Sequence, residues 1–261
     1  MRIIVCIKQV PDTNEVRLNP ETGTLIRDGV PSIINPDDKA GLEAALRLKD
    51  EQGATVTALS MGPPQAAEAL REALAMGADE AVLVTDRAFG GADTWATSST
   101  IASAIRKLGE YDLIITGRQA IDGDTAQVGP QIAEHLGLPH ISYAEELRLE
   151  GRHIIVKRQF EDRYHILKAN MPCLVTALSE LNAPRYMTPG GIFDAYLAKE
   201  IQILSRADLD VEDGNIGLGG SPTRVFRSFT KAVKGKGTVV TLDSEESAAW
   251  IAERLQDKFV I

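Results

Sequence analysis

The stretch YDLIITGRQAIDGDTAQVGPQIAEHL, residues 111–136, indicates the fold class of this chain. Its apolar start, 111–116, is typical of a buried parallel strand, and its end, 131–136, is typical of a helix. The loop between them, 117–130, has glycines that let the backbone approach a ligand closely. Because free amides at a helix start bind phosphate oxygens, this arrangement predicts a nucleotide site.

A second interpretation of this loop stays open. The loop matches neither G-x-x-x-x-G-K-[ST] nor G-x-G-x-x-G, the two common phosphate-binding patterns. Since Asp122 and Asp124 would repel a phosphate, affinity would have to come from backbone amides of residues 123–128, with the Thr125 hydroxyl as a further donor. Alternatively, Asp124 or Thr125 only caps the helix and Gly123 only turns the chain.

The chain up to residue 137 alternates strand-like and helix-like segments. Strands are expected at 2–8, 55–60, 80–84 and 112–116. Helices are expected from Asn35 to about 50, at 65–75, from Asp93 or Thr94 to about 108, and at 125–136. This alternation predicts an α/β fold with a doubly wound, mostly parallel sheet. If the first four strands take the order 3-2-1-4, as in many such sheets, the first and fourth strands flank the crevice.

The pattern changes after residue 137. Segments 141–149, 152–160 and 165–167 are typical of an antiparallel extension, and the apolar run 172–178 suits a strand that closes the sheet edge. We therefore expect a nucleotide-binding domain over 1–205. Residues 206–261 are expected to form a linker and a C-terminal arm, whose last helix has an apolar stripe that packs either on its own domain or on another chain. The stripe comprises Ala248, Ile251, Leu255 and Phe259.

Composition excludes several classes of protein. The net charge of −9 disfavours a nucleic-acid or anionic-membrane binder, and no apolar stretch approaches the roughly 20 residues of a membrane span. The N-terminus lacks a signal-peptide pattern, which favours a cytoplasmic protein. Cys6 and Cys173 lie in apolar runs and are expected to be core thiols in a reducing compartment. The four histidines lack ligand spacing, so we expect no metal site.

The ligand is expected beyond the carboxyl ends of the strands, where the strand order reverses. The ends of the first, second and fourth strands should converge there with the helix start at Asn35. Asp37 and Asp38 would repel phosphate and suit ribose hydroxyls or an adenine amino group. The hydroxyl-rich segment 88–98, after the third strand, either contacts a larger part of the ligand or forms only an N-cap and a solvated first helical turn.

The chain resembles, nearly end to end, the beta subunit of electron transfer flavoproteins. The resemblance rests on I-V-C-I-K-Q-V-P-D at the start, D-G-V-x-x-I-I-N-P-D-D at 28–38 and A-L-A-M-G-A-D at 73–79. It rests most specifically on T-G-R-Q-A-I-D-G-D-T-A-Q-V-G-P and on P-C-L-V-T-A-L-S-E-L-N-A-P-R-Y-M at 172–187. The resemblance implies an adenine-nucleotide-hydrolase-like domain, a heterodimer with an alpha subunit that holds FAD, and an arm that embraces that subunit.

In such beta subunits the nucleotide pocket holds AMP in the housekeeping group and a second FAD in the electron-bifurcating group. The segments T-A-Q-V-G-P, G-A-D-T-W-A-T and R-Y-M-T-P-G-G-I resemble the bifurcating group. The cofactor-binding residues expected here, by position and by resemblance, are Cys6, Asn35, Pro36, Asp37, Asp38, Met61, Asp93, Thr94, Thr97, Gly117, Arg118, Gln119, Ala120, Ile121, Asp122, Gly123, Asp124, Thr125, Ala126, Gln127 and Val128.

Three alternatives for function are open, of which the resemblance implies the first two. In the first, the complex takes electrons from NADH and divides them between ferredoxin or flavodoxin and, through the alpha-subunit FAD, an acyl-CoA dehydrogenase-type enzyme. Residues 185–194 match the partner-docking segment, although they depart from the housekeeping A-T-L-P-N-I version. In the second, a housekeeping carrier with structural AMP takes electrons from acyl-CoA dehydrogenases.

The third alternative is a free-standing nucleotide-binding or ATP-cleaving protein on the same fold. It is disfavoured because the S-G-G-x-D-S phosphate loop is missing after the first strand. No catalytic acid or base is expected in this chain.

Overall fold

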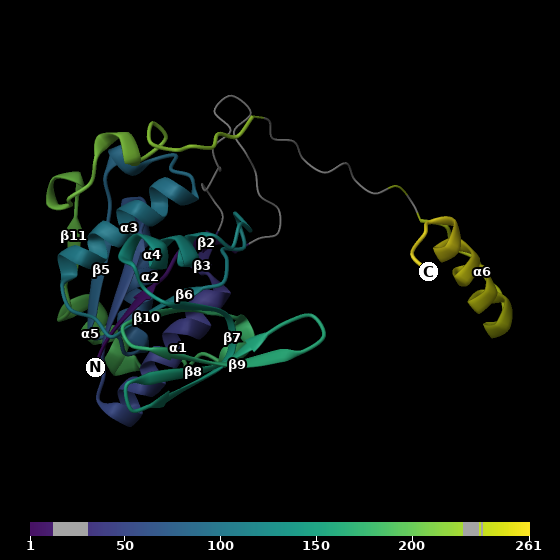
Figure 1. Cartoon of the computed structure of the whole chain (residues 1–261), viewed down its shortest axis with the longest axis horizontal. Helices are drawn as coiled ribbons and strands as arrows, with labels where there is room; N and C mark the ends of the chain where they lie inside the picture. The colour runs from purple at the N-terminus through teal and green to yellow at the C-terminus, as the bar shows by residue number, and fades with distance from the viewer. Residues whose placement is uncertain (13–30, 227–234, 236) are drawn as a thin grey trace. The chain divides into compact units, whose positions relative to one another are not determined.

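The computed structural model describes residues 1–12, 31–226, 235 and 237–261. The chain forms a compact unit, Met1–Phe226, and a second unit, Arg227–Ile261 (Figure 1). The first unit contains both sheets and the remaining helices, and the described part of the second unit contains helix α6, Ser244–Asp257.

The first unit is built on a nine-stranded sheet of order β11-β5-β4-β1-β6-β10-β7-β8-β9. Its centre consists of the first four predicted strands, β1 (Arg2–Cys6), β4 (Thr55–Met61), β5 (Glu80–Val84) and β6 (Leu113–Gly117). They are parallel and lie in the order β5-β4-β1-β6. The predicted doubly wound sheet is therefore confirmed, and its first four strands have the order 3-2-1-4 on which the expected place of the site depended.

The antiparallel extension is also confirmed. It consists of β7 (His140–Glu150), β8 (His153–Gln159) and β9 (Tyr164–Asn170). β8 lies between the other two and pairs antiparallel with each of them. Two short strands outside the prediction, β2 (Gln9–Pro11) and β3 (Ser32–Ile34), form a separate small antiparallel sheet.

The prediction that residues 172–178 close the sheet edge was wrong. β10 (Cys173–Ala177) lies between β6 and β7 and is parallel to both. All five of its residues are buried. A strand that is apolar on both faces suits the interior of a parallel sheet, where helices cover both sides. The edge beside β5 is instead closed by β11 (Ile201–Leu204), which pairs with it in parallel.

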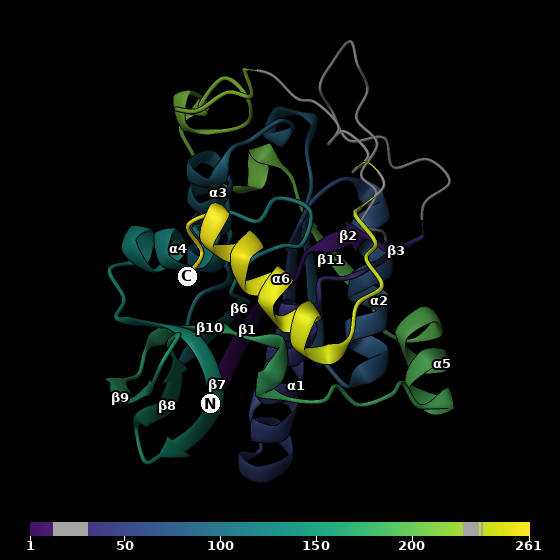
Figure 2. The ribbon, with the colours of Figure 1, turned by 90° about the vertical axis from the view of Figure 1, so that its right-hand side faces the viewer.

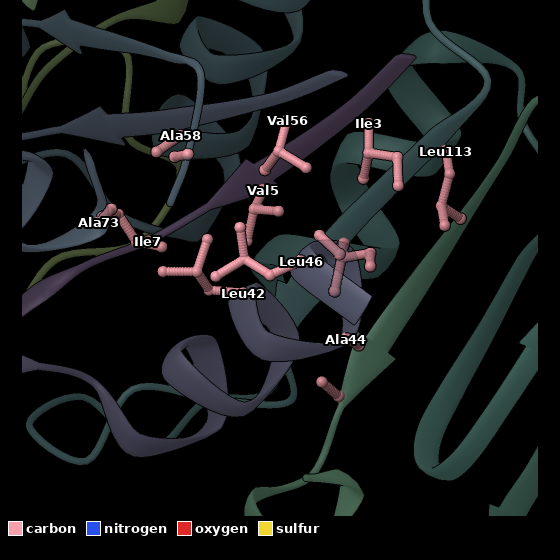
Figure 3. Packing of buried hydrophobic residues seen from close by; sticks show 14 of the residues in the cluster. Ile3, Val5, Ile7, Leu42, Ala44, Leu46, Val56, Ala58, Ala73 and Leu113 are labelled. Carbon is pink, nitrogen blue, oxygen red and sulfur yellow. The ribbon is translucent and has the colours of Figure 1, made fainter. Parts of the chain in front are cut away.

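Helices cover both faces of the sheet (Figure 2). α1 (Pro36–Gln52), α2 (Ala67–Met76) and α5 (Pro189–Leu197) contribute to one buried cluster. α3 (Thr94–Leu108) and α4 (Val128–Leu136) contribute to the other. Within β1 the side chains alternate between the clusters, because neighbouring strand residues point to opposite faces. Ile3 and Val5 pack with Leu42 and Leu46 of α1, as Figure 3 shows, whereas Ile4 belongs to the α3/α4 cluster.

The compact unit extends past residue 205, where the sequence analysis ended the α/β domain. Leu209 and Ile216 are buried in the α3/α4 cluster, so residues 206–226 pack on the α/β unit. Ser103 of α3 donates to the carbonyl of Asp210 at 2.9 Å and fixes the first part of this segment. No helix in the described part of the chain is long and apolar enough to cross a membrane.

Candidate functional site

A cavity of about 1550 Å³ lies at the carboxyl ends of the four central strands. Its lining includes Cys6 and Met61 at the ends of β1 and β4, Thr85 just after β5, and Gly117 at the end of β6. Pockets for drug-sized ligands typically measure about 300–1,000 Å³. The cavity thus occupies the position expected for a ligand of a doubly wound sheet, and it is large for a mononucleotide.

The end of β6 is packed closely against the start of α1. The amide of Gly117 donates to Asp38 Oδ1 at 2.9 Å, and a Cβ at position 117 would overlap the Asp38 carboxylate and backbone. The other oxygen, Asp38 Oδ2, accepts from the amide of Lys8 at 2.8 Å. Asp38 therefore joins the ends of β1 and β6. Burial raises its pKa to about 7, against the opposing effect of these amide donors.

Asn35 braces the loop 117–130 from the same helix start. It occupies the N-cap position of α1, as predicted, but its side chain makes no capping hydrogen bond. Its Nδ2 donates to the carbonyl of Gln119 at 2.8 Å, and its Oδ1 accepts from the amide of Ile121 at 3.1 Å. The amide side chain thus fixes the backbone of the loop instead of capping its own helix.

Asp37 points to a different partner. Its Oδ1 accepts from the amide of Ser179 at 3.0 Å, and its Oδ2 lies 3.4 Å from Arg118 Nε. Burial raises the pKa of Asp37, and the Arg118 guanidinium only partly opposes this. Since Asp37 and Asp38 both accept backbone hydrogen bonds from the protein, the two carboxylates mainly hold the site together.

The start of α4 differs from the prediction of a helix from Thr125. The helix begins at Val128, with Gln127 at an N-cap position that has no side-chain capping bond. Asp124 and Ala126 have φ angles of 54° and 53°, a left-handed conformation that is costly for non-glycine residues. The Asp124 carboxylate accepts from the side chain of Gln119. Neither Asp124 nor Thr125 caps α4, so the cap-only interpretation was wrong.

The loop leaves amide groups available to a ligand. Within the described residues, the backbone amides of Thr125, Ala126, Gln127 and Val128 donate to no other protein atom. Successive free amides next to left-handed residues form concave sites that suit anions. Gly129, on the first turn of α4, has no room for a Cβ because Thr116 and Thr176 lie against it. The helix start is therefore held directly over the strand ends.

The segment after β5 supplies another wall of the cavity. Asp93 caps α3 by accepting from the amide of Ala96 at 3.0 Å, which confirms the predicted cap. Thr94 Oγ1 donates to Gln127 Oε1 at 3.1 Å and joins this wall to the start of α4. The rings of Phe89 and Trp95 also line the cavity.

The structure brings most predicted site residues to the cavity but not all of them. Those that line it are Cys6, Asp38, Met61, Asp93, Thr94, Thr97, Gly117, Arg118, Gln119, Ala120, Gly123, Asp124, Thr125, Ala126, Gln127 and Val128. Those outside the lining are Asn35, Pro36, Asp37, Ile121 and Asp122. Of these, Asn35, Asp37 and Ile121 make the contacts that shape the loop.

Sequence reasoning missed several residues of the lining. Arg87 follows the end of β5, so its position after a strand could have identified it. Lys8, at the end of the first expected strand, also lines the cavity, where that strand end was expected. Lys8 Nζ forms an ion pair with Asp122 Oδ1 at 2.6 Å. Pro222, Thr223 and Val225 also line the cavity, and no pattern in the sequence connects them with it.

Cys6, at the end of β1, contributes a neutral thiol to the cavity. Burial, with a smaller effect of Asp38, raises the pKa of the Cys6 thiol to about 12, so the thiol stays protonated near neutral pH. Among the residues that the structure describes, no group of His, Cys, Asp and Glu side chains has the arrangement of a metal site. The cavity is thus suited to bind and orient a ligand.

Residues 22–208 match the family model described as "Electron transfer flavoprotein domain". The chain is 58% identical to "Electron transfer flavoprotein subunit beta" of Clostridium acetobutylicum, over 100% of both chains. It is 55% identical to "Caffeyl-CoA reductase-Etf complex subunit CarD" of Acetobacterium woodii, over 100% of both. It is also 49% identical to "Acryloyl-CoA reductase electron transfer subunit gamma" of Anaerotignum propionicum, again over 100% of both.

Proposed function

The chain belongs to the electron transfer flavoprotein family as a beta-type subunit, and from this premise we propose that its cavity binds FAD within a complex with an alpha subunit. The complex would pass electrons from NADH to ferredoxin or flavodoxin and, through a second FAD on the alpha subunit, to an acyl-CoA dehydrogenase-type enzyme. The names of the relatives from Acetobacterium woodii and Anaerotignum propionicum, which refer to acyl-CoA reductases, support this proposal.

The observation that carries the proposal is the extent of the cavity. It reaches from the loop after β6 to the segment after β5, and β1 and β4 lie between these two strands. Three strand spacings of about 4.8 Å correspond to about 14 Å. The two walls meet where Thr94 donates to Gln127, but the strand ends at the base of the cavity are this far apart. The volume of about 1550 Å³ is larger than a mononucleotide would fill, which favours FAD over AMP.

The residues present fit such a ligand. The free amides of residues 125–128 would hold the pyrophosphate, and the hydroxyls of Thr94 and Thr97 would face the ring system with Trp95. Gln9 lines the cavity, and its buried amide oxygen has no hydrogen-bond partner in the described structure. That oxygen could accept from a donor on the ligand.

The bound flavin would supply the redox chemistry, and the protein would determine its position and surroundings. Asp38 and Asn35 fix the loop whose amides would bind the phosphates. The buried strand ends exclude water from the base of the cavity. The neutral thiol of Cys6 adds no charge there.

The alternative is a housekeeping subunit that holds AMP. The amides of residues 125–128 would serve a mononucleotide equally well, so this half of the site does not discriminate between FAD and AMP.

The test is to produce the chain with its alpha subunit and to count nucleotides after denaturation. Two FAD molecules per complex and rapid flavin reduction by NADH are expected. One FAD and one AMP per complex would overturn the FAD proposal and favour the alternative.

We also propose that residues 185–194 dock the acyl-CoA dehydrogenase-type partner. Arg185 is fixed to α1 through Glu43 and Asp50, at 2.9 and 2.8 Å. Beyond this anchor Tyr186 and Phe193 are 95% and 65% exposed. A rigidly held segment with exposed aromatic rings is typical of a protein interface.

The second unit is proposed to contact the alpha subunit. α6 begins at Asp243, which caps it by accepting from the amides of Glu245 and Glu246. The helix buries no side chain within its own unit, and Ile251 and Phe259 of its apolar stripe are exposed. An amphipathic helix of this kind gains most of its stability from packing on a partner.

A further inference from the structure

Residues 217–225, which we call the strap, are fitted onto the segment that follows β5. Leu218 donates its amide to the carbonyl of Gly90 at 3.0 Å. Ser221 Oγ accepts from the amide of Asp93 at 2.8 Å and donates to the carbonyl of Gly217 at 2.7 Å. Gly217 has a φ of 57°, and a Cβ there would overlap the carbonyl of Ala88. These contacts hold the strap at one defined place beside the cavity.

Asp93 makes the contacts nearest the cavity. Its Oδ1 accepts from the amide of Ala96 and caps α3, as described above. Its Oδ2 accepts from both the amide and the hydroxyl of Thr223, at 2.9 and 2.8 Å. Burial would raise the pKa of Asp93, but the donors on Ala96 and Thr223 hold it below its ordinary value. Both carboxylate oxygens are thus engaged by the protein.

The strap is part of the cavity wall. Pro222, Thr223 and Val225 line the cavity together with Phe89 and Trp95 of the segment after β5. The amides of residues 125–128 belong to the loop after β6, and β4 and β1 separate the two strands. The two walls meet where Thr94 donates to Gln127, but the strap's hydrogen bonds run to Gly90 and Asp93 of the segment after β5. A dinucleotide would fill more of the cavity than a mononucleotide and would therefore have the larger contact with the strap.

We infer that Asp93 is a positioning residue that fixes the strap as a wall of the cavity, and that this wall makes the site favour a dinucleotide over a mononucleotide. The inference rests on the proposed function, because it assumes that the cavity binds an adenine nucleotide. It assigns to the C-terminal segment of the compact unit a role in ligand selection.

The variant Asp93→Asn separates the two roles of this side chain. Asparagine is a good N-cap, so the bond to Ala96 is retained. Its Nδ2 group, however, would meet the amide of Thr223, and two donors cannot bond each other. Thr223→Val removes only the hydroxyl donor and should have a smaller effect.

The matched control is Asp208→Asn. Asp208 Oδ2 accepts from the amide and the hydroxyl of Ser205 at 2.8 and 2.6 Å, the same pair of donors that Asp93 accepts from Thr223. Asp208 does not line the cavity. A general effect of losing one such carboxylate would therefore appear in both variants.

The experiment uses the full-length chain in complex with its alpha subunit. Affinity for AMP is measured with labelled AMP, and affinity for FAD by displacement of that AMP, so that FAD on the alpha subunit does not contribute. Asp93→Asn should weaken FAD binding about fivefold or more and AMP binding less than about twofold. Exchange of the Thr223 amide hydrogen should also become faster. Asp208→Asn should change neither affinity.

Two results would overturn the inference while the proposed function stands. One is that FAD displaces AMP equally well from the wild-type complex and from Asp93→Asn. The other is that the variant weakens FAD and AMP by the same factor, which would show that Asp93 has only a structural role. If FAD fails to displace AMP from the wild-type complex, both the inference and the FAD proposal are overturned.

Discussion

At the scale of single residues, Asp38 gives the fold a pH dependence. Its pKa is raised to about 7 in the folded chain, whereas an unperturbed aspartate titrates near 3.9. The folded state therefore holds the proton more tightly between these values. This contribution to stability is complete below pH 4 and is lost as the pH rises to about 7, by at most about 1.4 kcal/mol per pH unit.

Asp38→Asn should remove this part of the pH dependence. The variant should be less stable than the wild type, because its amide group cannot accept from both Lys8 and Gly117. The difference in the free energy of unfolding between wild type and variant should shrink as the pH rises from about 4.5 to about 7, the raised pKa of Asp38. Urea unfolding at several pH values measures it, with the exposed carboxylate variant Asp210→Asn as control. A constant difference across this range would contradict the prediction.

Gly117 provides a second test at this scale. In Gly117→Ala the added methyl group would overlap Asp38, and overpacking of this kind costs about 1–3 kcal/mol. Gly123→Ala lies in the same loop, and its Cβ would meet no atom within 4 Å. This control should change the free energy of unfolding by less than about 0.5 kcal/mol. Equal effects of the two substitutions in urea unfolding would show that the close packing at Gly117 is unimportant.

At the scale of elements, local patterns predicted the central strands and their order but not every pairing. The apolar runs of β1, β4, β5 and β6 are separated by helices, and right-handed crossovers leave few ways to arrange them. The run of β10 indicates burial on both faces, yet it carries no information about which neighbours it has. Its place between β6 and β7 depends on contacts far apart in sequence.

The candidate site, like the strand pairing, was predictable only in part. The loop 117–130 and the strand ends follow from the alternation of elements. The start of α4 at Val128 does not, because Asp124 and Ala126 have left-handed backbones and Asp124 is held by contacts with Gln119 and Ala120 that propensity does not report. The strap was missed because it reaches the cavity through hydrogen bonds to Gly90 and Asp93, without a motif of its own.

The anchor of residues 185–194 gives a prediction for an element. Burial would raise the pKa of Glu43, but hydrogen bonds from Arg185 outweigh it and the pKa is lowered. The resulting stability is present above the unfolded pKa of a glutamate and is lost as the pH falls through the lower folded value. Arg185→Ala should reduce the free energy of unfolding by about 1–2 kcal/mol at pH 7 and by less at pH 3.

Arg47→Ala is the matched control, since Arg47 also pairs with Glu43, at 3.2 Å. Its side chain is 53% exposed, so its loss should cost about 0.5 kcal/mol or less. Chemical unfolding at both pH values gives the comparison. The role assigned to Arg185 would be wrong if the two variants lost the same stability.

At the scale of the whole molecule, the two units differ in what holds them together. Both clusters of buried side chains lie within residues 1–226. Deletion of residues 227–261 should therefore change the free energy of unfolding of the compact unit by less than about 1 kcal/mol. The shortened chain should bind the alpha subunit at least tenfold more weakly, as size-exclusion chromatography and calorimetry would report. A shortened chain that is unfolded would show that the second unit is needed for the core.

The two last-made parallel strands have a consequence for how the chain folds as it is synthesised. β10 pairs Cys173 with Leu113, and β11 pairs Ile201 with Ala81, so neither side of the four central strands is covered until late residues have left the ribosome. The ribbon β7–β9 joins neighbours in sequence and can form earlier, since local contacts close at lower entropic cost. Pulse-labelled hydrogen exchange during refolding should protect the β8 amides before those of β10. Until β10 and β11 have paired, the open edges of β5 and β6 are exposed to pairing with other chains. This stage of folding is therefore the one most in need of a chaperone.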